Sequence, residues 1–363
     1  MGVVRDKLDY LSGTKRLLRE AINAVLADRG DPLLTESDPF ESYPSALYAG
    51  SPPPSADSLT GSAADKLLRL NETKSRLREA INAELGIGLT ESDPFRFYGE
   101  SIWTPRALFL QGEQGALYLP EPENLFQDAA GTTPVTADGD PVGLMLDKSG
   151  NGNHVSQSVA ASRPIYRTDG TLHWLEFDGV DDYLQVPNSE SSFIWLHDGS
   201  GGGSAVAVEF LSDDEFQPVL QQTSSATADT GFQATRLDRA AQSEDNGYRI
   251  SAYSGSTTGV TQINANVSDL IGLTPHVMRH DLISQGTSDD FQYWQNGMLK
   301  NSQQALNLSS SAASYPLTLM ATGNNTFLTH GKLYGAVLRQ GGMRAEIGAA
   351  VDSYLATKAG ITL

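Results

Sequence analysis

The chain has 363 residues, 39% of them hydrophobic, which is enough for two or three folded units with sizeable cores. It contains no cysteine, so disulfide frameworks and thiolate metal sites are excluded. The net charge is −19, and residues 107–363 carry −16 of it, so nucleic acid is not expected as a partner of that part. No apolar run approaches the ~20 residues of a membrane span, and charges stand where a signal peptide would be apolar.

An internal repeat dominates the first third of the chain. Residues 11–26 and 70–85 have closely similar sequences, and each copy continues into the string Leu-Thr-Glu-Ser-Asp-Pro-Phe, at 34–40 and 89–95. Apolar residues in both copies recur at the i, i+3, i+4 spacing of one helix face. The aspartate before the proline is expected to cap a second helix. Each copy is therefore predicted to be an α-helical hairpin.

Each hairpin carries an apolar stripe that a unit of about 35–40 residues does not cover by itself. We expect the stripe to dock, either on the sister copy or on another protein, so the repeats are interpreted as anchors. The alternative is a self-contained helical domain that packs on the rest of the chain. The predicted interface residues are Leu18, Ile22, Leu26 and Phe40 in the first copy and Leu77, Ile81, Leu85 and Phe95 in the second.

Composition divides the chain into four parts. The predicted first repeat covers residues 1–48, and a Pro-, Ser- and Gly-rich linker covers 49–64. The second repeat covers 65–106, and a larger β-rich domain covers 107–363. The linker is expected to be extended and to hold the two repeats apart.

The part from residue 107 onward alternates short β-type runs with clusters of Gly, Asn, Asp and Ser. Seven or more strands at this spacing predict a mainly β protein with an antiparallel sandwich. Asn296-Gly297 is a hairpin turn signal, because both residues tolerate positive φ. Residues 344–359 are predicted to form a closing helix, with Gly360 at its C′ position. The expected strands are residues 172–177, 205–211, 248–253, 276–283, 291–294, 317–321 and 331–338.

Five segments resemble the laminin-G or concanavalin-A-like domain found in many bacteriophage and prophage virion proteins. They are residues 125–136, 147–154, 162–164, 175–184 and 351–363. The resemblance implies a jelly-roll, lectin-type fold that contacts carbohydrate. The N-terminal repeats resemble short modules of phage appendage proteins.

This resemblance implies a virion structural protein, such as a tail fibre or spike, that is assembled in the host cytoplasm. Its expected partners are other virion proteins, further copies of itself and host-surface glycans. Three alternatives stay open: a glycan-degrading enzyme, a purely structural capsid or tail decoration, and a bacterial surface adhesin, against which the missing export signal counts.

Two groups of residues are candidates for glycan contact. In the stretch 291–296, Gln292, Trp294 and Asn296 share the strand face opposite Phe291 and Tyr293. If the Phe and Tyr are core, the tryptophan is flanked by amides, as in a sugar-stacking platform. The alternative is that Trp294 packs against a neighbouring strand, loop or subunit.

A polar loop supplies the second group of candidates, Asp147, Asn151 and Asn153. These side chains are expected either to contact a ligand or to form a structural turn.

No catalytic constellation is found, and the protein is predicted not to be an enzyme. Glu36, Asp38 and Glu41 match the Glu-x-Asp-x-x-Glu pattern of sandwich β-glucanases, but they fall in the helical repeat, and Arg96 replaces the last carboxylate in the second copy. Retaining hydrolysis needs two carboxylates that converge on one cleft. The sequence contains no nucleophile elbow and no phosphate-binding loop.

No metal site or cofactor is predicted, with Ca²⁺ at an acidic cluster as the one exception left open. The clusters are Asp181-Asp182, 213–215 and Asp289-Asp290. His276 and His280 have the spacing of a zinc helix, but they lack the accompanying glutamate and lie in a strand-like run.

Overall fold

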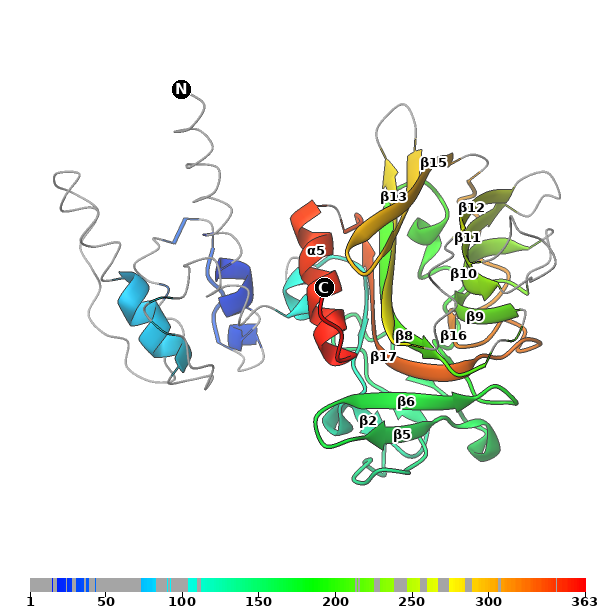
Figure 1. Ribbon diagram of the computed structural model, residues 1–363, viewed down its shortest axis with the longest axis horizontal. Helices are drawn as coiled ribbons and strands as arrows, with labels where there is room; N and C mark the ends of the chain where they lie inside the picture. Colours follow the sequence, from blue (N-terminus) through cyan, green and yellow to red (C-terminus); the bar gives the residue numbers. More distant parts are fainter. Residues whose placement is uncertain are drawn as a thin grey trace. The chain divides into compact units, whose positions relative to one another are not determined.

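A computed structural model of the chain divides it into two units, Met1–Gly112 and Glu113–Leu363 (Figure 1). None of the helices it describes is long and apolar enough to cross a membrane. It describes residues 15, 18–23, 25–27, 31–35, 37–38, 43, 73–82, 90, 92, 104–109, 112–212, 214, 216–224, 229–237, 247–254, 260–266, 274–284, 289–305, 308–343 and 345–363.

In the first unit, the equivalent residues of the two repeats are buried alike. Leu18 and Ile22 in the first copy, and Leu77 and Ile81 in the second, have no exposed surface, and Leu26 is 2% exposed. These five side chains are therefore covered within the single chain, and docking of the repeats on another protein stays a prediction. Three further predicted interface residues lie outside the described residues: Phe40, Leu85 and Phe95.

Side-chain hydrogen bonds tie the first helix to the segment that follows it. The Asn23 amide donates to the carbonyl of Leu34 at 2.8 Å and accepts its N–H at 2.7 Å. The Asp38 carboxylate turns back to accept the N–H and hydroxyl of Thr35, which lowers the pKa of Asp38. Asp38 thus closes the turn before it, and the start of the helix that it is predicted to cap lies outside the described residues.

The second unit is a sandwich of two antiparallel sheets, as predicted. The first sheet has eight strands in the order β15-β14-β13-β8-β17-β6-β5, with β1 paired to β17. Its strands are β1 (Gly115–Tyr118), β5 (Ile165–Thr168), β6 (His173–Asp178), β8 (Gly202–Phe210), β13 (His276–Ser284), β14 (Asp289–Gln295), β15 (Met298–Ala305) and β17 (His330–Gln340).

The second sheet has nine strands in the order β12-β11-β10-β9-β16-β7-β4-β3-β2. Its strands are β2 (Leu125–Phe126), β3 (Leu144–Met145), β4 (Val155–Ser156), β7 (Leu184–Gln185), β9 (Phe216–Gln221), β10 (Thr230–Leu237), β11 (Gly247–Ser254), β12 (Val260–Asn266) and β16 (Thr318–Leu319). The short helices are η2 (Pro105–Phe109), η3 (Pro122–Asn124), η4 (Ala160–Ser162), η5 (Ile194–Leu196) and the closing helix α5 (Ala345–Lys358).

The core lies between the two sheets, because each strand turns alternate residues inward. On the second sheet, Leu184, Leu319, Leu220 and Ala234 form one cross-strand row and belong to the core. The facing strands of the first sheet contribute core residues including Val206, Val208, Met278, Leu282, Phe291 and Tyr293.

His280 joins the two sheets from inside the core. Its ring stacks on Phe232 at 4.4 Å, and its Nδ1 is hydrogen-bonded to the Ser204 hydroxyl at 2.7 Å. Burial lowers the pKa of His280 to about 3, so the ring is neutral. His276 and His280 both lie on the extended strand β13, where four residues span roughly 13 Å. The zinc-like spacing therefore brings no pair of ligands together.

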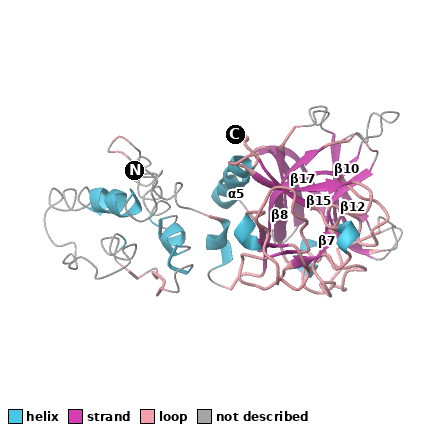
Figure 2. Ribbon diagram, turned by 90° about the horizontal axis from the view of Figure 1, so that it is seen from below, coloured by secondary structure: helices cyan, strands magenta, loops and turns pink. Residues whose placement is uncertain are grey.

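Two local signals are confirmed by the backbone. Asn296 and Gly297 have φ values of 47° and 75° and connect β14 to β15, as a type I′ turn requires. Gly360 has a φ of 70° and follows α5. The helix packs on β8, β13 and β17, on the face of the first sheet that points away from the core (Figures 1 and 2).

Candidate functional site

Trp294 lies where the strand alternation predicts, but it is not an open platform. It is half-buried on the outer face of β14, and the guanidinium carbon of Arg279 lies 4.4 Å from the ring centroid. The Asn296 side chain accepts the N–H of Val277 at 2.8 Å, which extends the pairing of β13. Gln292 is half-buried opposite Asp281. The structure thus favours the alternative interpretation, in which Trp294 packs on the neighbouring strand.

Hydrogen bonds attach the predicted polar loop to β1. The buried Asp147 carboxylate accepts the N–H groups of Leu117 (2.9 Å), Ser149 (2.8 Å) and Asn153 (3.0 Å), together with the Ser149 hydroxyl. The amides of Asn151 and Asn153 donate to the carbonyl of Gly115, at 3.2 and 2.8 Å. These polar atoms already have partners inside the chain, which favours the structural-turn alternative for all three residues.

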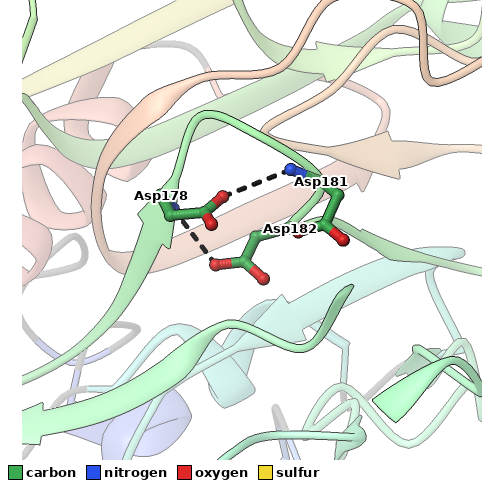
Figure 3. A group of neighbouring side chains, drawn as sticks. All are labelled: Asp178, Asp181 and Asp182. Carbon is green, nitrogen blue, oxygen red and sulfur yellow. Dashed lines mark hydrogen bonds between the residues drawn. The ribbon is translucent and has the colours of Figure 1, made fainter. Parts of the chain in front are cut away.

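Three carboxylates gather just after β6, at Asp178, Asp181 and Asp182 (Figure 3). Their potential ligand atoms lie within 4.8 Å of one another. Burial raises the pKa of Asp182 to about 6. Asp178 accepts the N–H of Val180, and Asp181 accepts the Ser162 hydroxyl. Three carboxylates supply about half of the six to eight oxygens that Ca²⁺ takes, so calcium binding stays a prediction of the sequence.

A row of uncharged polar residues crosses the outer face of the second sheet. Gln185, Thr318, Gln221, Gln233 and Ser251 follow one another from β7 to β11. The last four have no exposed surface, and the side-chain oxygens of Gln221, Gln233 and Ser251 lack a hydrogen-bond partner. Full burial closes the centre of this row to a large ligand.

A different cluster, whose side chains are half-buried or buried, lies on the outer face of the first sheet, and sequence reasoning missed it. The strand register places Glu176 (β6), Lys332 (β17) and Glu209 (β8) in one cross-strand row. Trp174 precedes Glu176 by two residues and therefore shares its face. Tyr334 lies at the β-bulge between Leu333 and Gly335. We call these five side chains the Trp174 cluster.

The Trp174 cluster combines aromatic surface with an ion-pair network. The Glu209 carboxylate accepts from Lys332 Nζ at 2.9 Å and from the Tyr334 hydroxyl at 2.8 Å. The ammonium of Lys332 lies 5.4 Å from the Trp174 ring centroid, and the Tyr334 ring lies 5.9 Å from it. Burial, together with the Glu209 carboxylate, raises the pKa of Tyr334 well above its usual value. Tyr334 therefore stays protonated and holds Glu209 in place.

The rim of the cluster is polar and accessible. Arg167 lies 3.5 Å from Glu176 and 3.7 Å from Asp138, and the Arg167 and Glu176 side chains are 35% and 34% exposed. The Lys332 and Glu209 side chains are 22% and 13% exposed, and Trp174 is half-buried. An aromatic ring beside fixed donors and acceptors suits a ligand with apolar faces and hydroxyl edges.

The cluster was missed because its members are far apart in the sequence. Trp174 and Glu176 alternate with the core residues Leu175 and Phe177, and this pattern is visible in the sequence. The pairing of β6 with β17, and of β17 with β8, is not visible there. The useful signal would have been a tryptophan placed on the polar side of an alternating strand.

No protein-family model matches the chain, and no curated protein matches its sequence. Solved structures that are similar include the IT-sialidase CBM40 of Ruminococcus gnavus, at 10% identity over 49% of this chain and 94% of that one, with a TM-score of 0.38. A GH54 α-L-arabinofuranosidase is 10% identical over 71% and 66%, with a TM-score of 0.45. The receptor binding domain of botulinum neurotoxin D is 9% identical over 58% and 50%, with a TM-score of 0.42.

The chain thus spans half of the neurotoxin domain's length. The sandwich architecture stands on the strand pairing of the chain itself.

Proposed function

We propose that the sandwich binds carbohydrate through the Trp174 cluster and does not cleave it. The observation that carries this proposal is the half-buried Trp174 ring, flanked by the Lys332–Glu209–Tyr334 network on the outer face of the first sheet. The ring offers a surface for the apolar face of a sugar, and the charged groups offer hydrogen bonds to its hydroxyls. The −16 charge of residues 107–363 favours an uncharged glycan.

The wider proposal is a virion structural protein that presents this sandwich to host-surface glycans. The sequence resemblance to phage virion domains and the two matching repeats support it. We place the chain in the virion, with other virion proteins and further copies of itself as partners. The repeats remain the proposed anchor, but through surfaces other than the buried stripes, since Leu18, Ile22, Leu77 and Ile81 are already covered. A purely structural decoration is the outcome to expect if no glycan binds.

The binding proposal is tested with two matched tryptophans. Trp174 and Trp294 are both half-buried on the outer face of the first sheet, each beside a basic side chain. Trp174→Ala is expected to weaken glycan binding by about 1–3 kcal/mol, roughly 5- to 150-fold in Kd, by analogy with stacking on flat ligands. Trp294→Ala should leave Kd unchanged. Calorimetric titration with neutral oligosaccharides from host surfaces measures both.

Circular dichroism of each variant confirms that the fold is retained. If Trp174→Ala binds glycan as tightly as the wild type, this contradicts the Trp174 cluster as the binding site. If only Trp294→Ala loses glycan affinity, Trp294 is the sugar-stacking platform that the sequence predicted.

The second expected result is that no polysaccharide is hydrolysed. Glu176 and Glu209 share one face, but Arg167 is paired with Glu176, and Lys332 with Glu209. A glycosidase needs two carboxyl groups that act on the scissile bond, and both carboxylates here are held in ion pairs. An assay for reducing ends with the full chain should stay at background. Release of reducing ends that Glu209→Gln abolishes would instead support the glycosidase alternative.

A further inference from the structure

A buried ion cluster fastens α5 to the first sheet. Arg279 on β13 donates from Nε to both carboxylate oxygens of Asp352 on α5, at 3.0 and 3.1 Å. Its Nη1 donates to Asp281 on the same strand and to the carbonyl of Met343 at 3.2 Å. Asp281 also accepts the N–H of Met343. All three charged residues are at most 3% exposed.

The backbone around the cluster leaves just enough room for these side chains. A Cβ at Gly203 of β8 would lie 2.4 Å from the Asp281 carboxylate, and one at Gly348 of α5 would lie 2.6 Å from the Arg279 guanidinium. The Trp294 ring covers the guanidinium from β14. The absence of a side chain at Gly203 and at Gly348 thus makes room for the cluster on both β8 and α5. The ion cluster is therefore an integral part of the contact between the helix and the sheet.

The cluster has one negative charge in excess when both carboxyl groups are ionised. Asp281 and Asp352 bring two negative charges, and Arg279 brings one positive charge, into a buried site. Other described ion pairs on the packed elements are Lys332 of β17 with Glu209 of β8, Arg339 of β17 with Glu113, and Lys358 of α5 with Glu121. The side chains of Arg344 and Glu346 lie outside the described residues. His280 faces the core, where burial lowers its pKa to about 3, so it does not titrate near neutral pH.

We propose that the Arg279–Asp281–Asp352 cluster is a proton-controlled latch, which holds α5 firmly when one carboxyl group is protonated and loosens it when both are ionised. The physical reason is the cost of burying an uncompensated charge, which a single proton removes. The latch acts on the docking of α5 and is independent of any glycan site.

The raised pKa values of the two aspartates agree with a latch that loosens as the pH rises. Burial raises the pKa of Asp281 to about 6, against the opposing effect of Arg279, and burial also raises the pKa of Asp352. A carboxyl group whose pKa is raised on folding contributes stability that is present below its unfolded pKa and is lost as the pH rises through the folded value. Docking should therefore weaken between about pH 4 and pH 6 and remain weak above that.

Hydrogen exchange of the α5 amides in the full chain tests the latch. Protection factors, corrected for the pH dependence of intrinsic exchange, are compared at pH 5 and pH 8. With a shift from the ordinary carboxyl value to about 6, the wild type should lose about tenfold in protection between these pH values. Asp281→Asn keeps the shape and removes the surplus charge, so its α5 protection should be the same at both pH values.

Asp138→Asn, which alters an exposed carboxylate outside the cluster, is the matched control and should keep the tenfold loss. Asp352→Asn provides a second neutral variant and should behave like Asp281→Asn. A wild-type α5 whose protection is constant or rises with pH would overturn the latch. So would neutral variants that keep the wild-type pH dependence.

Discussion

Arg279→Met is expected to lower the free energy of unfolding of the sandwich by about 3–5 kcal/mol, since breaking a buried ion pair leaves uncompensated charge behind. Methionine keeps most of the aliphatic stem but none of the hydrogen bonds to Asp281, Asp352 and the Met343 carbonyl. Urea unfolding followed by tryptophan fluorescence, together with near-UV circular dichroism, measures the loss.

Arg167→Met is the matched control on the same face of the same sheet. The Arg167 side chain is 35% exposed, and its two ion pairs span 3.5 and 3.7 Å, so its loss should cost less than ~1 kcal/mol. Adding Asp281→Asn and Asp352→Asn to Arg279→Met should recover most of the lost stability, because an uncharged set leaves no buried ion. An Arg279→Met protein as stable as Arg167→Met would show that the cluster holds α5 weakly.

The parts of the fold that depend on local chemistry were predictable from the sequence. The I′ turn at Asn296-Gly297, the C′ glycine after α5, and the inward Phe291 and Tyr293 each follow from the conformational preference of one or two residues. The sandwich class followed from the repeated strand pattern. These signals act over fewer than about ten residues.

The site was not predictable in the same way, because it depends on which strands pair. Trp174, Glu209 and Lys332 come from three strands, and register alone sets them side by side. A one-residue slip of β17 would turn Lys332 into the core. The two-residue strands β2, β3, β4, β7 and β16 are likewise held by their neighbours and have no helical or strand period of their own.

Trp294 shows how a correct local prediction can leave the surroundings of a side chain undetermined. Its position opposite the core face was predicted correctly, but the arginine that covers its ring lies on a different strand. The helical repeats show the same limit, because their apolar stripes were recognised but the sequence left open whether they are covered within the chain or by another protein. In both cases the missing information is the tertiary partner.

Asp147→Ala is expected to destabilise the sandwich by about 2–4 kcal/mol, because each buried donor left without an acceptor costs ~1–3 kcal/mol. The carboxylate accepts from three backbone N–H groups and one hydroxyl, and these bonds hold residues 147–153 on β1. Asp169→Ala is the control, because Asp169 also accepts two backbone N–H groups but is exposed. Water can therefore replace the Asp169 carboxylate, and the loss of stability should be much smaller.

Thermal unfolding and glycan titration of Asp147→Ala are measured on the same samples. If Asp147 is structural, Asp147→Ala lowers Tm and leaves the glycan affinity of the remaining folded protein unchanged. An Asp147→Ala protein with wild-type Tm and weakened glycan binding would contradict the structural role and make this loop the ligand site.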